Sequence, residues 1–569
     1  MATGPHGQRY EAHRPVVMGR NGMVCSGQAL ASEAGIATLR RGGNAVDAAM
    51  AVAAALNVTE PGMSGVGGDG FIMVYRRGGT NADPALGGTV EVVNATGAAP
   101  LAATRQAYGD GIPMRGIRSV STPGLVDGWL EAHARHGRLP LEQCLEPAIG
   151  LAQDGFPVSH VLAGYVAEVP ELVRFPSSAA VFAPKGRPLQ AGEILVQRDL
   201  AQTFRAIARE GRAAFYEGPI ARAVVAASEK AGGLLSVEDF ARHHARWQAP
   251  IATDYHGYRV LESPPNSSGH VLLQELNLVE RFDLEKLGCN TAEAIHVMVE
   301  AKRLAFADRE QYMADPEWVD VPIEGLLSKE YAAERAKLIN PARAMTNVEA
   351  GDPWPYTGRA PRPMPVAAGG RSGGGDTTCF AVVDGEGNAV CQIQSIQSAM
   401  GSGFVAEGTG ILLNNRMTYW HLEEGHADSL EPGKRVRHTM NTAMVFKDGG
   451  LFLVHGTPGA DTQVQTNLQV FTNIAHFGMT VAEAVEAPRW RHIGKGTEST
   501  VPHGEADQLN LEARFPEDVR EGLRRLGHPV NVIGDWAGSG NEVAILVDRV
   551  NGALHGACDP RRDGYAMGY

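Results

Sequence analysis

The stretch SGGGDTTCFAVVDGEGNAV, Ser372 to Val390, joins a run of glycines directly to residues that are typical of a buried strand. Upstream, residues 351–375 contain 12 Gly or Pro in 25 positions, a composition that is not expected to form regular structure. An aspartate and two threonines stand at the junction. A breaker-rich segment that enters a core strand in this way suggests that the junction itself has a chemical role.

Cleavage between Asp376 and Thr377 would give such a role to the threonine, because it would carry a free α-amine beside its hydroxyl. A threonine hydroxyl is a weak nucleophile until a base takes its proton, and an N-terminal amine can be that base. An α-amine has a pKa of about 7.7–8.0, whereas a lysine has one of about 10.4. The junction therefore favours a precursor that is cut to expose an N-terminal threonine. The alternative is a linker that runs into an ordinary core strand.

The turn sequence DGEGN, residues 384–388, lies between two apolar runs and predicts a β-hairpin. A five-residue loop pairs Val383 with Ala389 and places Thr377 opposite Ser395. Directly opposed residues point to the same face, with their Cβ atoms about 5.5 Å apart or less, so we expect the two hydroxyls to hydrogen-bond. A four-residue loop would shift the register by one and remove this contact.

Length and composition indicate a large globular protein. Its 569 residues exceed the limit of roughly 250–300 residues for one core, which predicts two or more domains or one large multilayer unit. The formal net charge of −13 argues against a nucleic-acid or anionic-membrane partner. The most apolar run, Ala45 to Val58, contains Asp47 and is too short to span a bilayer. The first residues lack the apolar core of a signal peptide, so we expect a cytoplasmic protein.

Sequence patterns divide the chain into a helix-rich first part and a strand-rich second part. Residues 26–58 predict two helices, and residues 125–330 predict mainly helix. Beyond the Gly/Pro-rich segment, short β-like runs with turn signals continue as far as Leu468. Two segments resemble helix capping boxes: Asn290 to Glu293 and Thr480 to Glu483.

We expect no cofactor and no metal. Gly65-x-Gly67-x-x-Gly70 matches a dinucleotide-binding fingerprint, but it follows a helix and opens a strand, which reverses the context that this motif requires. The six cysteines form no CxxC pair, and the chain contains no HExxH motif.

Two sets of segments stand out along the chain. In the second part they are DTTCFAVVDGEGNAV, GSGFVAEGTGILLNN, HGTPGAD and DPRRDGYAMGY. In the first part they are ASEAGIATLRRGGNAVDAAMAVAAALNVTEP, SGVGGDGF, STPGLVDGW and ESPPNSSGH. These segments, in their order along the chain, resemble the γ-glutamyltranspeptidase family of N-terminal-nucleophile (Ntn) hydrolases. The resemblance spans nearly the whole chain. It implies an α+β fold, a four-layer αββα sandwich, made as a proenzyme that cuts itself into two subunits.

The implied cut before Thr377 gives a large subunit, residues 1–376, and a small subunit, residues 377–569. Whether these units pair further into a dimer stays open. The resemblance makes Thr377 the nucleophile and matches Ser395 to an assisting threonine. It also matches Gly459 and Ala460 to a Gly-Gly pair whose backbone N–H groups form the oxyanion hole, where an alanine methyl group is tolerable because the donors are backbone groups.

Positions that contact the substrate in γ-glutamyl enzymes differ in this chain. Thr96 stands where those enzymes have an arginine that clamps the α-carboxylate. Their three ligands of the α-ammonium match Gln397, Arg416 and Tyr419. Their Ser-Ser pair matches His438 and Thr439.

Arg416 therefore stands where an ammonium group should bind, and that repulsion would cost on the order of several kcal/mol. Glutathione is expected to be a poor substrate. The NR pair after GILLN, the HTMN segment and the GGDGF loop resemble the oxamate amidohydrolase-like branch of the family, which implies that Arg416 pairs with a substrate carboxylate.

The predicted function is thus an autoprocessed amidohydrolase with an N-terminal threonine, acting on a small-molecule amide that bears a carboxylate. Four alternatives stay open: a true γ-glutamyltransferase or glutathione hydrolase, a processed but inactive binding protein, a structural ion pair for Arg416 that faces away from the site, and a packing role for His438.

Overall fold

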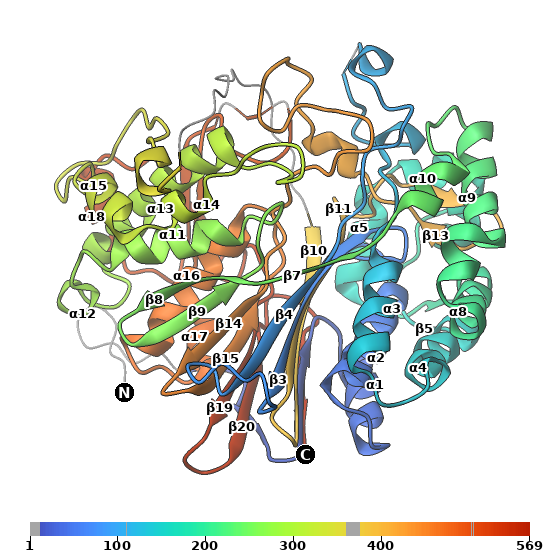
Figure 1. Ribbon diagram of the computed structural model, residues 1–569, viewed down its shortest axis with the longest axis horizontal. Coiled ribbons are helices and arrows are strands. Elements are labelled where there is room, and N and C mark those ends of the chain that lie inside the picture. Colours follow the sequence, from blue (N-terminus) through green and yellow to red (C-terminus); the bar gives the residue numbers. More distant parts are fainter. Residues whose placement is uncertain (1–11, 110, 360–375, 502, 505) are drawn as a thin grey trace.

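The computed structural model describes residues 12–109, 111–359, 376–501, 503–504 and 506–569 (Figure 1). Two seven-stranded antiparallel sheets pack face to face in the middle, and helices cover both outer faces. This arrangement confirms the predicted four-layer αββα sandwich.

The first sheet contains the hairpin predicted around residues 384–388. Its strands, in spatial order, are β21 (Tyr565–Gly568), β2 (Gly22–Ser26), β10 (Asp376–Asp384), β11 (Ala389–Gln397), β3 (Asp69–Arg77), β4 (Gly88–Ala95) and β7 (Arg246–Gln248). Its outer face packs against α1 (Ala29–Arg40), α2 (Ala45–Thr59) and α3 (Leu125–His136), while α4 (Leu141–Asp154) packs on α2 and α8 (Arg198–Glu210) packs on α4.

The second sheet has the order β1 (Val17–Gly19), β20 (Ala553–Cys558), β19 (Val543–Asp548), β15 (Gly450–Gly456), β14 (Ala443–Lys447), β9 (Tyr258–Glu262) and β8 (Ile251–Tyr255). Its outer face packs against α11 (Gly269–Val279), α16 (Thr462–Ala475) and α17 (Val481–Glu486), while α13 (Ala292–Tyr312) packs on α11 and α18 (Glu517–Arg525) packs on α13. An apolar core between the sheets includes Phe71, Met444 and Val454. The sandwich therefore has three apolar interfaces, one between the sheets and one under each helical layer.

The buried helix α2 shows how the sequence supports this packing. The Asn44 side chain accepts from the N–H of Asp47, and the Asp47 side chain accepts from the N–H of Asn44, which forms a capping box. All 15 residues of α2 are buried. Its many alanines favour the helix and let α1, α4 and the sheet approach closely.

The prediction that residues 125–330 are mainly helical is confirmed, although strands β7, β8 and β9 also lie there. Strands β7 and β8 are short and mostly only half-buried, so their apolar pattern is weak. The second part likewise contains the 14-residue helix α16, where we expected β-like runs. Both parts of the chain supply strands to both sheets, so the predicted helix-rich and strand-rich halves are not separate bodies.

Two smaller predictions have different outcomes. The capping box at Thr480 is confirmed, because its side chain and that of Glu483 exchange bonds with each other's backbone N–H. The box at Asn290 is wrong by one residue, since Thr291 caps α13 and Asn290 has a φ of 54°.

The Gly/Pro-rich segment is described only in its first part, and residues 360–375 lie outside the described residues. Residues 351–359 include one 3₁₀ turn, Trp354–Tyr356, which corrects the expectation that no regular structure forms there. Trp354 is buried in a small cluster with Tyr312, Leu326 and Tyr331.

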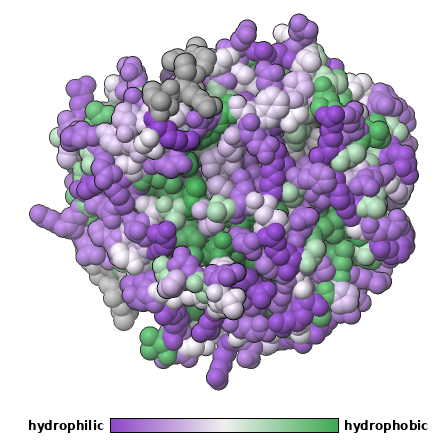
Figure 2. All heavy atoms as spheres, in the orientation of Figure 1, coloured by the Kyte–Doolittle hydropathy of each residue, from purple (hydrophilic) through white to green (hydrophobic). Residues whose placement is uncertain are grey.

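The surface in Figure 2 is mostly hydrophilic, with apolar side chains gathered in patches between polar ones. No helix in the described parts of the chain is both long and apolar enough to cross a membrane.

Candidate active site

The β10–β11 hairpin places the predicted nucleophile at the start of β10, which is drawn in yellow between the two helical layers (Figure 1). The predicted register holds for Thr378–Val383. Before it, Asp376 pairs with Gln397, which is one residue out of step, so a bulge falls at Thr377. Thr377 Oγ1 donates to Ser395 Oγ at 3.3 Å, and both residues are buried. The predicted contact is confirmed, although it forms across a bulge.

Ser395 is fixed by its own neighbours. Its Oγ accepts from the N–H of Gln397 at 2.8 Å, and its backbone pairs with Asp69 at the start of β3. Gln397 has a φ of 84°, in the region that non-glycine residues rarely adopt. Such an outlier persists only where the surroundings over-determine it, and it points to a site at this end of β11.

The loop after β15 runs close to the start of β10. A Cβ at Gly456, the last residue of β15, would lie 2.7 Å from Cys379 Sγ, so only glycine fits there without a shift. Cys379 is two residues beyond Thr377. The chain then reaches Gly459 and Ala460, the predicted oxyanion-hole residues, just before α16.

Gly459 and Ala460 form a turn with φ values of 119° and 49°. Their carbonyls accept from the N–H groups of Thr462 and Gln463 at 3.0 and 3.1 Å. Within the described parts of the chain, neither Gly459 N–H nor Ala460 N–H donates a hydrogen bond. Two such free backbone donors are what an oxyanion hole requires.

Asp461 anchors this turn and was not predicted from the sequence. It accepts from Arg309 Nη1 at 2.6 Å and from the N–H and Oγ of Ser499 at 2.8 and 2.6 Å. Burial opposes its charged form, but Arg309 and Ser499 outweigh burial and lower its pKa to about 2. Asp461 is therefore a fixed anion that is already fully paired.

Arg416 is buried at 1% exposure and forms an ion pair, as one alternative proposed. Its Nε lies 3.2 Å from Asp69 Oδ2, and its guanidinium lies 5.1 Å from the centre of the Tyr419 ring. The pair does not face away from the site, because Asp69 is the backbone partner of Ser395. Among the described residues, Arg416 Nη2 has no hydrogen-bond partner.

Asp69 was not predicted as a site residue, although it stands in the GGDGF motif. Its second oxygen accepts from Gly97 N–H at 2.7 Å. Burial raises its pKa, and the charge of Arg416 opposes this. Asp69 therefore orients Arg416 through Nε and leaves the far side of the guanidinium open.

Three more predicted residues meet at Tyr419. Burial raises the pKa of Tyr419, and the nearby side chains of Thr439 and Gln397 oppose this by lowering it. Gln397 Oε1 accepts from Ser398 Oγ, and Gln397 Nε2 has no partner among the described residues. The structure thus brings Gln397, Arg416, Tyr419 and Thr439 together.

His438 has an unusual environment for a packing histidine. Its ring packs edge-on against Phe71 with 5.9 Å between centroids, and neither ring nitrogen has a hydrogen-bond partner in the described structure. Burial, and then the charges of Arg416 and Arg435, hold its pKa well below its ordinary value. The ring is therefore neutral and has polar atoms left to bind a ligand.

Thr96 plays a different part. It is fully buried, and its Oγ1 donates to Asn94 Oδ1 at 2.7 Å. Asn94 in turn bonds Asn266, whose carbonyl accepts from the N–H of His438 at 2.7 Å. The structure therefore places Thr96 in the support of His438.

A cleft of about 510 Å³ lies at the other end of β10. It is lined by turns that include Asp384, Gly449 and Arg549, and by none of the predicted site residues.

Comparison with known proteins agrees with this geometry. A family model described as Gamma-glutamyltranspeptidase matches residues 31–569. The glutathione hydrolase-like YwrD proenzyme of Bacillus subtilis is 38% identical over 560 residues, 97% of this chain and 99% of the relative. The oxamate amidohydrolase proenzyme of Klebsiella pneumoniae is 34% identical over 558 residues, 96% of this chain and 98% of the relative.

Solved structures extend the likeness to the fold. The crystal structure of cephalosporin acylase from Bacillus halodurans has a TM-score of 0.87 and 35% sequence identity, and the match covers 99% of each chain. The chain therefore belongs to the gamma-glutamyltranspeptidase family of Ntn hydrolases and is an enzyme of amide bonds, a hydrolase or acyltransferase.

Proposed function

We propose that this chain is a precursor that cuts itself between Asp376 and Thr377 and then hydrolyses a small, carboxylate-bearing amide of the oxamate type. Strand β10 begins at Asp376, so the proposed scissile bond is the first peptide bond of this strand. Attack of the Thr377 hydroxyl on the Asp376 carbonyl forms an ester as the peptide C–N bond breaks. Water then hydrolyses the ester and leaves residues 1–376 and 377–569.

In the processed enzyme, the α-amine of Thr377 takes the proton of the hydroxyl as the oxygen attacks the substrate carbonyl. The N–H groups of Gly459 and Ala460 stabilise the oxyanion. The amine then passes its proton to the leaving amide nitrogen. Water, activated by the same amine, hydrolyses the acyl-enzyme ester and restores the hydroxyl.

The observation that carries the choice of substrate is the open side of Arg416. Its Nη2 is buried without a partner among the described residues, and so are Gln397 Nε2 and both nitrogens of the neutral His438, one of which carries a proton to donate. Buried donors without partners carry a desolvation cost that a bound anion removes. A carboxylate fits this group of donors.

The two nearby carboxylates are already paired within the protein, which argues against an ammonium-bearing substrate. Asp69 is engaged by Arg416 and Gly97, and Asp461 is engaged by Arg309 and Ser499. An α-ammonium would therefore approach Arg416 without a free carboxylate to offset the repulsion.

The second candidate is a γ-glutamyltransferase or glutathione hydrolase. Its support is the glutathione hydrolase-like relative of Bacillus subtilis, since that protein is at least as similar to this chain as the oxamate amidohydrolase.

A substrate comparison tests the proposal. We expect the processed protein to release ammonia from oxamate with a kcat/KM at least about 10-fold above that for γ-glutamyl p-nitroanilide, since a lost charged hydrogen bond costs roughly 1.5–3 kcal/mol. Oxamide, which has no carboxylate, is the control for the anion. Preference for the γ-glutamyl substrate would overturn the proposal and support the second candidate.

A further inference from the structure

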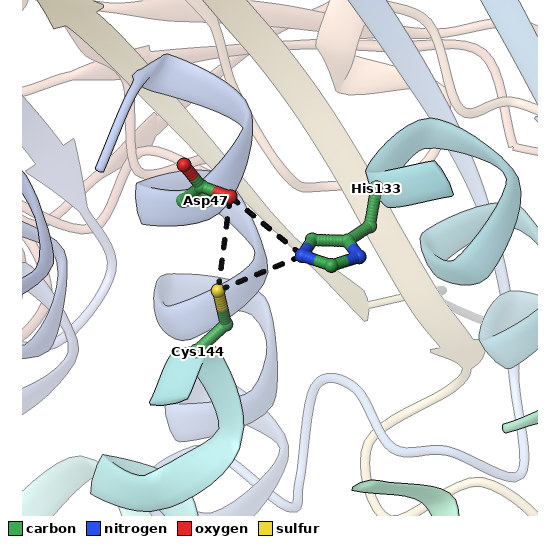
Figure 3. A group of neighbouring side chains, drawn as sticks. All are labelled: Asp47, His133 and Cys144. Atoms are coloured by element: carbon green, nitrogen blue, oxygen red, sulfur yellow. Dashed lines mark hydrogen bonds and ion pairs between the residues drawn. The ribbon is translucent and has the colours of Figure 1, made fainter. Parts of the chain in front are cut away.

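Three groups of neighbouring side chains outside the catalytic machinery contain ligand-type atoms, among the residues that the structure describes. Figure 3 shows one of them, Asp47, His133 and Cys144. The oxygens of Asp47 accept three backbone N–H groups, and His133 Nε2 lies 2.8 Å from the carbonyl of Leu139, to which it donates. Burial, and then Asp47, raise the pKa of Cys144 to about 12. These atoms already make contacts within the protein, so the group joins α2 to α3 and α4 and is not proposed as a metal site.

The second group, His296, Glu300 and His528, is similar. The two rings are joined by a hydrogen bond of 2.7 Å, and His296 Nε2 lies 2.8 Å from the carbonyl of Asn340. Glu300 accepts from the N–H of Met345. This group is also held by bonds within the protein.

The third group differs from the other two: it consists of Glu310, near the end of α13, with His421 and His426, and His503 lies beside it against Glu310. Glu310 Oε1 lies 2.6 Å from His503 Nε2, 3.3 Å from His421 Nε2 and 3.6 Å from His426 Nε2. Its Oε2 is bound by Arg437 Nη1 at 2.5 Å. His421 is 1% exposed at its side chain, and neither of its nitrogens makes a hydrogen bond within the described structure. The buried His421 ring therefore has its Nε2 close to the Glu310 carboxylate without a hydrogen bond between them.

His421, His503 and Glu310 have the spacing of ligands on one tetrahedral zinc ion. With Zn–N bonds of about 2.0–2.1 Å, two ligand atoms lie about 3.3 Å apart and two imidazole centroids about 5 Å apart. The His421 and Glu310 atoms are 3.3 Å apart, and the His421 and His503 centroids are 5.2 Å apart with the rings inclined at 59°. The His503–Glu310 contact would widen by about 0.7 Å on ion binding.

The outer partner of His503 is that of a metal ligand. Its Nδ1 donates to the carbonyl of Glu498 at 2.5 Å. Such a carbonyl partner holds the far nitrogen protonated and directs Nε2 at the ion.

His426 is excluded as a ligand by its own contacts. Its Nδ1 accepts from the N–H of Asp428 at 2.9 Å, so its Nε2 carries the proton. Its ring also stacks on His421 with 3.6 Å between centroids and 17° between planes. Two parallel rings at this spacing cannot both direct Nε2 at one tetrahedral ion, so His426 covers the His421 ring.

We propose that Glu310, His421 and His503 form a binding site for a divalent ion of the zinc class. The ion would join α13 to two segments that pack on the substrate side. His421 lies two residues after Tyr419, and the N–H of Val501 donates to the carbonyl of Thr418. On the same helix, Arg309 anchors Asp461. The ion would therefore have a structural role, because it would hold the segment that contains Tyr419 and His421 against α13.

Zinc titration of the untagged, EDTA-treated processed protein tests the proposal, with a chromogenic zinc chelator as competitor. We expect one Zn²⁺ per chain. His421→Asn and His503→Asn should each weaken binding by more than about 100-fold, since loss of an outer partner alone costs roughly 10- to 100-fold. Zn²⁺ should also raise the Tm of the wild type and not that of either variant.

His133→Asn and His426→Asn are the matched controls, and both should keep the stoichiometry of one, with affinities within about 10-fold of the wild type. Absence of zinc binding by the wild type, wild-type affinity in both His421→Asn and His503→Asn, or loss of the ion in His133→Asn would each overturn the proposal. If a ligand variant does not fold, the Co²⁺ spectrum of the wild type decides, because strong visible bands indicate a tetrahedral site and weak bands or none contradict it.

Discussion

Thr377 Oγ1 donates a hydrogen bond of 3.3 Å to Ser395 Oγ, which also accepts from the N–H of Gln397 at 2.8 Å. These bonds hold the hydroxyl of the proposed nucleophile in one orientation, on the side of β10 that faces the second sheet. They join the two strands of the hairpin at the point where the ladder is irregular. The site is thus built on a bulge that side-chain bonds stabilise.

Thr377→Ala should leave one uncut chain without activity, because both the cleavage and the hydrolysis use this hydroxyl. Intact-mass measurement gives the result directly, since the wild type should yield residues 1–376 and 377–569 as separate species. Thr377→Ser keeps a hydroxyl and should still be cut. Two normal fragments from the alanine variant would contradict the assignment of Thr377.

Ser395→Ala should lower kcat/KM and slow the cleavage by roughly 2- to 13-fold each, which corresponds to the loss of one hydrogen bond of about 0.5–1.5 kcal/mol. Ser395→Thr keeps the acceptor and is the control. Time courses of precursor cleavage on denaturing gels and initial rates on the best amide measure the two effects. An unchanged rate in both assays would show that Ser395 does not position Thr377.

Arg416→Gln should lower kcat/KM for oxamate by roughly 10- to 150-fold, because a charged hydrogen bond contributes about 1.5–3 kcal/mol. Rates on oxamide, the neutral analogue, should change much less. The decisive quantity is the ratio of the two kcat/KM values. An unchanged ratio in the variant would remove Arg416 from carboxylate recognition.

Ala460→Gly should keep activity and raise the Tm slightly, because an alanine at a φ of 49° is strained by about 1–2 kcal/mol and glycine is not. Ala460→Val should lower both Tm and kcat, since a β-branched residue is poorly tolerated at this φ. Thermal unfolding and initial rates of the two variants check this. A glycine variant that is less stable than the wild type would show that the alanine methyl group contributes packing.

Glu275 should make the protein less stable as the pH rises from about 5 to 8. It is fully buried in α11, its oxygens have no hydrogen-bond partner among the described residues, and burial raises its pKa to about 8, against Lys302 and Arg309. In the unfolded chain it ionises near 4.5. A raised pKa in the fold gives stability that is present below the unfolded pKa and is lost as the pH rises to the folded one.

Glu275→Gln cannot ionise, so its stability relative to the wild type should increase by up to about 1.4 kcal/mol per pH unit across this range. Thermal unfolding at both ends of the range measures the difference. Glu33→Gln, an exposed change, should show none. A constant difference between Glu275→Gln and the wild type would contradict a neutral Glu275.

Local sequence predicted the features that depend on neighbouring residues. The DGEGN turn fixed the register and therefore the Thr377–Ser395 contact, and the Thr480 box marked a helix start. The reversed context of the Gly65–Gly70 motif is also correct, because β3 begins at Asp69. Short half-exposed strands such as β8 were missed, since their weak alternation becomes a strand only when β9 pairs with it.

The sequence by itself determined the family, the sandwich and the junction at Thr377, because turn residues, strand patterns and motifs act over a few positions. Only the tertiary structure decided that Arg416 pairs with Asp69, that Arg309 holds Asp461 beside the oxyanion turn, and that Glu310 meets three histidines. These partners are far apart along the chain. Their contacts depend on how two sheets and two helical layers pack, and no local pattern records that packing.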